Sequence, residues 1–365
     1  MPGDEAAILR FQDKIASERI QLTSLQNQLS EIEFDLWAAL RVDSQLVARL
    51  DQVSSRLKGG DGDNGLLHWI ETLPFPLASI LRLWQTTPDN RHKDRYEHLL
   101  QFFEATTEFI GIIFLSAFAR DPKTFDKLRT KIDSTLRSQG LSLSRSTFGA
   151  WKVVVEILGA EIREELDGKN SAQIGELFSD KSNELPRGLS SIALGQIFSE
   201  ANRVRNDWTG HGGAVPPKVA EHRHRQAWDL LEKLRIHFSS VWKCTKLIQP
   251  VVGRDMETYH ENEVRLLVGS NNQFVTKTIK TGSSLPTTRL YLVSGEETQT
   301  LKLEPLVRMA ASPVDEMNAC YFFNRYEGES ARFVTYHFST VGEVDQPVGS
   351  LSAPVAPFFV GQSSS

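Results

Sequence analysis

The chain has 365 residues, 40% of them hydrophobic and 24% charged, with a formal net charge of −5 at pH 7. These values are ordinary for a soluble globular protein of two or three domains. They exclude a strongly basic protein that coats nucleic acid through bulk charge, although a local basic site remains compatible with them.

Residues 5–58 carry hydrophobic side chains at the heptad spacing of a coiled coil. The a positions are Ile8, Ile15, Leu22, Leu29, Leu36, Leu50 and Leu57. Glu18 and Asp43 interrupt this seam. We expect a long coiled-coil helix over residues 1–62 that pairs with another chain. The alternative is an amphipathic helix that packs on its own chain, with a glycine-rich boundary at residues 59–65 in either case.

Residues 66–250 follow a helical period almost throughout and predict an antiparallel bundle. The expected helices are 66–73, 77–85, 94–120, 125–139, 147–166, 189–206 and 218–246. We expect Gly140 to cap one helix and Pro216-Pro217 to begin another. The most apolar run, residues 109–119, is about half of the ~20 residues that cross a bilayer, so it predicts a buried helix and no membrane span.

From about residue 262 the hydrophobic period changes from 3.6 to 2. The expected strands are 263–269, 274–280, 288–294, 299–307, 320–326 and 331–338. They predict a small antiparallel β domain over residues 255–342, which residues 249–253 separate from the helices. Residues 343–365 predict a flexible tail. The predicted fold class is therefore α+β.

One stretch is typical of chemistry rather than packing: Arg205-Asn206-Asp207-Trp208-Thr209-Gly210-His211. Imidazole transfers protons near neutral pH, and a guanidinium stabilises charge that develops on a phosphate. Held together, the two groups supply what RNA cleavage without a metal needs. Gly210, Gly212 and Gly213 turn the chain and allow a phosphate to approach the backbone closely.

The spacing and Asn206 resemble the Arg-x(4–6)-His signature of HEPN-domain ribonucleases, over roughly residues 66–250. The resemblance implies an all-α domain that dimerises and brings two motifs into a composite cleft. It implies that His211 handles the proton of the attacking 2′-hydroxyl or the leaving 5′-oxygen, and that Arg205 stabilises the pentavalent phosphate. Asn206 would orient His211 or bind substrate. The expected products are a 2′,3′-cyclic phosphate and a 5′-hydroxyl, formed with no metal or cofactor. Members of this family commonly act as toxins or as effectors of antiviral defence.

Cationic side chains flank the motif and suit an RNA backbone, because phosphate contacts supply most of the affinity. Those expected to bind RNA are Arg203, His222, Arg223, His224 and Arg225. A purely structural interpretation stays open. An arginine near a helix C-terminus is favoured by the helix dipole, so Arg205 and Asn206 would cap the helix while His211 satisfies the turn.

Other chemistries lack their motifs. The sequence contains no P-loop, no Gly-x-Ser-x-Gly and no Cys-x-x-Cys or His-Glu-x-x-His zinc pair. The two cysteines, Cys244 and Cys320, lie far apart, and residues 1–5 are acidic, so we expect free thiols and a cytoplasmic protein. The aromatic residues of the predicted strands, with Tyr336 and His337 among them, are expected to be core or ordinary strand residues.

Two functions are consistent with these patterns. The first is a dimeric endoribonuclease whose β domain senses, recruits or restrains. The second is a non-catalytic interaction or sensor subunit that assembles with partner proteins through the coiled coil or the β domain.

Overall fold

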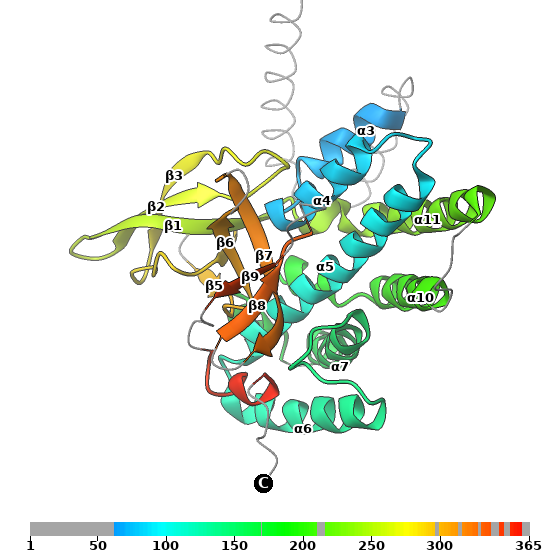
Figure 1. Ribbon diagram of the computed structural model, residues 1–365. Coiled ribbons are helices and arrows are strands. Elements are labelled where there is room, and N and C mark those ends of the chain that lie inside the picture. The colour runs from blue at the N-terminus through cyan, green and yellow to red at the C-terminus, as the bar shows by residue number, and fades with distance from the viewer. Residues whose placement is uncertain are drawn as a thin grey trace, which may run out of the picture. The chain divides into compact units, whose positions relative to one another are not determined.

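The structure of the protein is a computed structural model (Figure 1). It describes residues 62–168, 170–209, 216–295, 299–312, 316–327, 330–336, 343–346 and 351–359. The coiled coil predicted for residues 1–62 lies outside them, apart from Gly62, and stays a prediction. Contacts divide the chain into two compact units, Met1–Leu66 and Leu67–Ser365, and the following account concerns the second.

Helices fill most of the first part of this unit. They are α3 (Gly62–Ile70), α4 (Phe75–Thr86), α5 (His92–Phe118), α6 (Pro122–Ser138), α7 (Phe148–Asp167), α8 (Ser171–Phe178), α9 (Glu184–Leu189), α10 (Ile192–Thr209) and α11 (Pro217–Val241). The predicted helices are confirmed with shifts of a few residues at their ends. We did not predict α8 and α9, because 8 and 6 residues are too few to display a helical period.

The central element of the helical part is α5, which packs against α4, α7, α10 and α11. Its apolar stretch is buried, as predicted for residues 109–119. By length and composition α5 is able to cross a membrane, but 89% of its apolar window is buried within the fold, as in the core helix of a soluble protein. Helix α7 approaches α5 so closely that a Cβ on Gly111 would lie 2.5 Å from Cε3 of Trp151.

Local signals fix the helix ends. The side chain of Asp121 accepts a hydrogen bond from the backbone N–H of Thr124 at the start of α6. Gly140 ends α6 with a φ of +66°, and the N–H of Leu141 donates to the carbonyl of Leu136 at 2.8 Å. Helix α11 begins at Pro217, as predicted.

The strands form two antiparallel sheets, whereas the sequence predicted a single small sheet or barrel. The first has the order β3-β2-β1-β4-β5 and the second β6-β7-β8-β9. The strands are β1 (Thr245–Asp255), β2 (His260–Leu266), β3 (Thr276–Thr281), β4 (Tyr291–Ser294), β5 (Thr300–Lys302), β6 (Val307–Ala311), β7 (Asn318–Glu327), β8 (Ser330–Val334) and β9 (Glu343–Gln346).

Strand β1 corrects two predictions: the helix over 218–246 ends at Val241, and the expected linker at 249–253 is strand. Pro250 made this segment look like a break. Proline has no N–H to donate to a neighbouring strand. Strand β4 pairs with β1 only from Thr245 to Ile248, and the register between β1 and β2 shifts just after Pro250. The lack of an N–H at Pro250 is therefore tolerated in β1.

Part of the predicted flexible tail is also ordered. Residues 343–346 form β9, and a 3-10 helix spans Ala356–Phe358. The buried ring of Phe359 packs 6.2 Å from that of Trp151 and 5.3 Å from that of Phe323.

Helices and sheets pack together throughout this unit. The N–H of Phe75 donates to the carbonyl of Leu267 at 2.9 Å, and the N–H of Ser146 donates to the carbonyl of Asn324 at 2.7 Å. The N–H of Glu304 donates to the Ser116 hydroxyl at 2.9 Å. The boundary predicted at residues 250–255 therefore falls inside one compact unit.

Candidate functional site

The arginine of the motif lies at the end of α10. This helix continues to Thr209, beyond the predicted end at Asn206, so Arg205 and Asn206 belong to its last turns. The Asn206 side chain is exposed, and that of Arg205 is 31% exposed. Helices α10 and α11 pack against each other (Figure 1), and His211 is in the connection between them, outside the described residues.

Arg205 forms an ion pair across the helical layer with Glu104 of α5. Its Nη2 atom lies 3.4 Å from Oε2 and 3.5 Å from Oε1 of the Glu104 carboxylate. The backbone N–H of Phe148, at the start of α7, is near enough to this carboxylate to influence its pKa. Burial raises the pKa of Glu104, while Arg205 and the Phe148 amide act in the opposite direction.

Glu108 lies one turn further along α5 and is fully buried. Within the part of the chain that the structure describes, neither of its carboxyl oxygens has a hydrogen-bond partner. The Ser146 hydroxyl is near enough to lower the pKa of Glu108 without reaching hydrogen-bonding geometry. Burial, and then the charge of Glu104, raise the pKa of Glu108 well above its ordinary value, so this carboxyl keeps its proton to a higher pH than an ordinary glutamate does.

We call Glu104, Glu108 and Arg205 the buried glutamate–arginine cluster. Tyr336, just after β8, interacts electrostatically with all three, and burial raises the pKa of its hydroxyl. Its ring lies 5.7 Å from that of Phe322. Tyr336 thus lies near the motif arginine, whereas the sequence predicted only a core or ordinary strand residue at this position.

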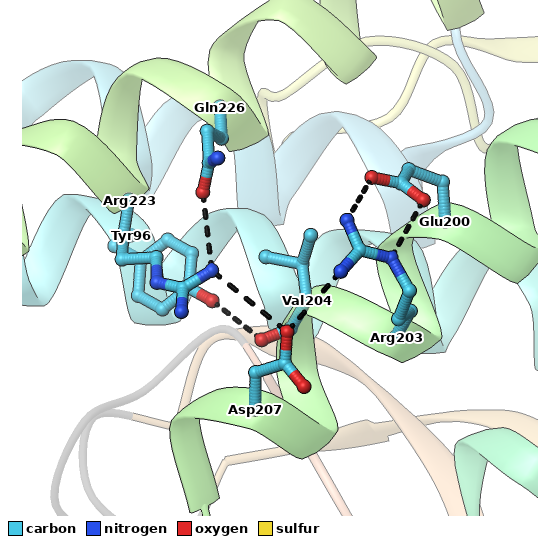
Figure 2. A network of polar contacts seen from close by, with 7 residues as sticks. All are labelled: Tyr96, Glu200, Arg203, Val204, Asp207, Arg223 and Gln226. Carbon is cyan, nitrogen blue, oxygen red and sulfur yellow. Dashed lines mark hydrogen bonds and ion pairs between the residues drawn. The ribbon is translucent and has the colours of Figure 1, made fainter.

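A second network ties α10 to α11 at the two ends of the connection that holds His211 (Figure 2). One carboxyl oxygen of Asp207 lies 3.3 Å from Nη1 of Arg203 and 4.0 Å from Nη1 of Arg223. The hydroxyl of Tyr96 on α5 donates to the carbonyl of Val204 at 3.1 Å. Asp207 therefore links the end of α10 to α11 through Arg223.

The predicted RNA-binding arginines are paired with carboxylates. Arg203 bonds Glu200 at 2.6 Å, and Arg225 bonds Glu221 at 3.0 Å. Each arginine near the motif thus has a carboxylate partner: Arg203 pairs with Glu200, Arg205 with Glu104, Arg223 with Asp207 and Arg225 with Glu221. The cationic patch that the sequence suggested is compensated within the fold, so phosphate binding here requires an exchange of ion-pair partners.

The two predicted RNA-binding histidines point in different directions. His222 is exposed on α11. His224 turns inward, and its Nε2 accepts a hydrogen bond from Nε1 of Trp84 at 3.3 Å. Burial, helped by the nearby Arg95 and His92, lowers the pKa of His224 to about 4. A neutral, hydrogen-bonded ring supplies no charge to a phosphate, so we no longer expect His224 to bind RNA.

His224 makes the stability of the fold sensitive to acid. Its pKa is about 4 in the fold and 6.5 ordinarily, so the unfolded chain takes up a proton first as pH falls from 6.5 toward 4. We expect His224→Gln, whose amide oxygen still accepts from Trp84, to lose less melting temperature than the wild type between pH 7 and pH 4.5. The matched control is His222→Gln. An equal loss in wild type and in His224→Gln contradicts the prediction.

Metal ligands do not gather in the described part of the chain. No group of three His, Cys, Asp or Glu side chains there is able to hold a metal ion. Neither cysteine forms a disulfide; Cys244 is exposed and Cys320 is buried. A groove of about 470 Å³ lies along α10 on the side of Arg203, and Arg163, Ser190 and Gln196 contribute to its lining.

The motif, its carboxylate partners and the inter-helix network define the candidate site. No family model, curated protein or solved structure matches the chain. The residues of the motif therefore carry the resemblance to HEPN-domain ribonucleases by themselves.

Glu104, Glu108 and Tyr336 were not predicted as site residues. The sequence contained a signal for the two glutamates, because they are spaced i, i+4 and stand directly before the apolar run of α5. Buried carboxylates of that kind are rare unless they are paired or functional. Tyr336 gave no comparable signal, since its approach to Arg205 depends on how the second sheet packs on the helices.

Proposed function

We propose that the protein is a metal-independent endoribonuclease that acts as a dimer, as an effector of a prokaryotic defence or toxin system. One observation supports this most directly: Arg205 lies partly exposed in the last turns of α10, immediately before the connection that contains His211. A guanidinium and an imidazole at one end of a helix pair are suited to a phosphodiester.

In the proposed reaction His211 transfers a proton to or from the 2′-hydroxyl or the 5′-oxygen, and Arg205 stabilises the phosphorane. The exposed Asn206 contacts the substrate or His211. The product ends are a 2′,3′-cyclic phosphate and a 5′-hydroxyl. Two copies of the chain bring two motifs together, with the predicted coiled coil of residues 1–62 supporting the dimer.

RNA binding in this proposal relies on exposed cations near the motif. Arg203, Arg225 and His222 are exposed, and Arg203 borders the groove along α10. A phosphate that replaces Glu200 or Glu221 as the partner of an exposed arginine exchanges one surface ion pair for another. Ion pairs between exposed side chains add little to stability, so the exchange costs little.

The alternative is a non-catalytic interaction or sensor subunit. The ion pair between Arg205 and Glu104 favours it, because Arg205 then stabilises the packing of α10 on α5 and needs no substrate. In that case the protein would assemble with partner proteins and cut no RNA.

Digestion of RNA in EDTA separates the two functions. We expect purified full-length protein to cleave RNA with the chelator present and to leave 2′,3′-cyclic phosphate ends, because the chemistry needs no metal. End-group analysis by mass spectrometry reads both properties at once. Strict dependence on a divalent cation, or 3′-hydroxyl products, contradicts the endoribonuclease proposal, and a lack of cleavage at any protein concentration favours the interaction subunit.

A further inference from the structure

We infer that Glu104 is the positioning residue of Arg205: its carboxylate holds the guanidinium at the end of α10 in the orientation that meets a phosphate. The inference deepens the proposed function and rests on it for the identity of the reaction. The ion pair itself is a property of the fold and is testable without any substrate.

Both partners of the pair are attached to rigid parts of the molecule. Glu104 is on the core helix α5, its side chain is only 15% exposed, and its carboxylate lies near the backbone N–H of Phe148 at the start of α7. On the other side, Tyr96 of α5 donates to the carbonyl of Val204, the residue before Arg205. The backbone that carries the arginine and the side chain that receives it are therefore both anchored to α5.

Among the described residues, the cluster contains two carboxyls for one guanidinium, and the geometry decides which one is charged. Nη2 of Arg205 lies within 3.5 Å of both oxygens of Glu104, whereas Glu108 is buried without a hydrogen bond from the described residues. Two carboxylates so close together do not both ionise readily. Glu104 therefore carries the charge and Glu108 the proton, which leaves one carboxylate to orient one guanidinium.

This arrangement has a consequence for catalysis that a purely structural ion pair lacks. The carboxylate reduces the net positive charge around Arg205 but restricts its rotation. Removing the charge leaves a guanidinium that attracts RNA at least as well as before and is poorly oriented in the transition state. Turnover should fall while substrate binding holds, because orientation contributes to kcat and charge contributes to affinity.

The test compares Glu104→Gln and Glu104→Asp with the wild type and with a control variant, Glu97→Gln. Glu97 lies on the same helix, pairs with Lys93, and is more exposed than Glu104. We expect Glu104→Gln to lower kcat for RNA cleavage by about 10-fold or more, with KM unchanged or lower. Glu104→Asp should restore part of the loss, and Glu97→Gln should match the wild type. Wild-type kcat in Glu104→Gln, or a rise in KM that accounts for the whole loss, overturns the inference.

A second measurement keeps the inference testable if the protein cuts no RNA. Thermal unfolding of Glu104→Gln, Arg205→Gln and the double variant forms a double-mutant cycle. We expect the double variant to lose clearly less melting temperature than the two single losses added together, because each single change already breaks the pair. Additive losses overturn the positioning role. Absence of cleavage by the wild type, together with a coupled pair, overturns the ribonuclease proposal alone.

Discussion

Replacement of His211 by alanine is expected to lower the rate of RNA cleavage by about 10²–10⁴-fold, the contribution that a general acid or base typically makes. Arg205→Lys should cause a loss of similar order, because lysine keeps the charge but lacks the planar fork that contacts a phosphate through two N–H groups. Initial rates on a fluorescent RNA, measured in EDTA with each purified full-length variant, give both values.

The matched control is His222→Ala, since His222 is an exposed histidine at the start of α11. A contact with the RNA backbone contributes affinity that depends on salt and little to the chemical step, so this variant should keep its kcat. Cleavage that survives in His211→Ala, or falls equally in His211→Ala and His222→Ala, would remove His211 from the catalytic role.

Hydrophobic periodicity predicted the longer helices because the hydrogen bonds and the side-chain period of a helix are local properties of the sequence. The apolar run within α5 needed no knowledge of the fold, and Gly140 ended α6 through its own backbone freedom. Strand β1 was missed because Pro250 and Gly253 are usually signs of a break. Its pairing with β2 and β4 is a long-range property that removes the objection to proline.

The candidate site was predicted only in part, for a related reason. The motif is a local pattern, so Arg205 and Asn206 could be identified as neighbours at a helix end. The partner of Arg205 is 101 residues away in the sequence, and no local pattern connects the two. The run of His and Arg at residues 222–225 looked like one surface patch. Successive residues of a helix point in directions about 100° apart around its axis. His224 therefore faces Trp84, whereas His222 and Arg225 stay exposed.

The buried carboxyl of Glu108 should make the fold less stable as pH rises. Its pKa is raised well above the ordinary value of 4.5, so between pH 4.5 and the folded pKa the folded state holds a proton that the unfolded chain has released. The free energy of unfolding then declines by about 1.4 kcal/mol per pH unit from this group. We expect Glu108→Gln, which stays neutral at every pH, to be more stable than the wild type at pH 8, by an amount that grows as pH rises above 4.5.

At pH 4.5 the same substitution should change little, because Glu108 is neutral in the folded state and only about half ionised in the unfolded chain, which is a small difference in free energy. Urea unfolding at pH 4.5, 6 and 8 measures the difference, with Glu97→Gln on α5 as the control for loss of an exposed carboxylate. Parallel pH curves for the wild type and Glu108→Gln contradict the assignment of a protonated Glu108. Glu108 would then ionise in the folded state as readily as in the unfolded chain, and Glu104 would not be the single charged carboxylate of the cluster. A divergence that grows with pH instead leaves Glu104 as the charged carboxylate of the pair, because a neutral Glu108 adds no charge to compete for the guanidinium.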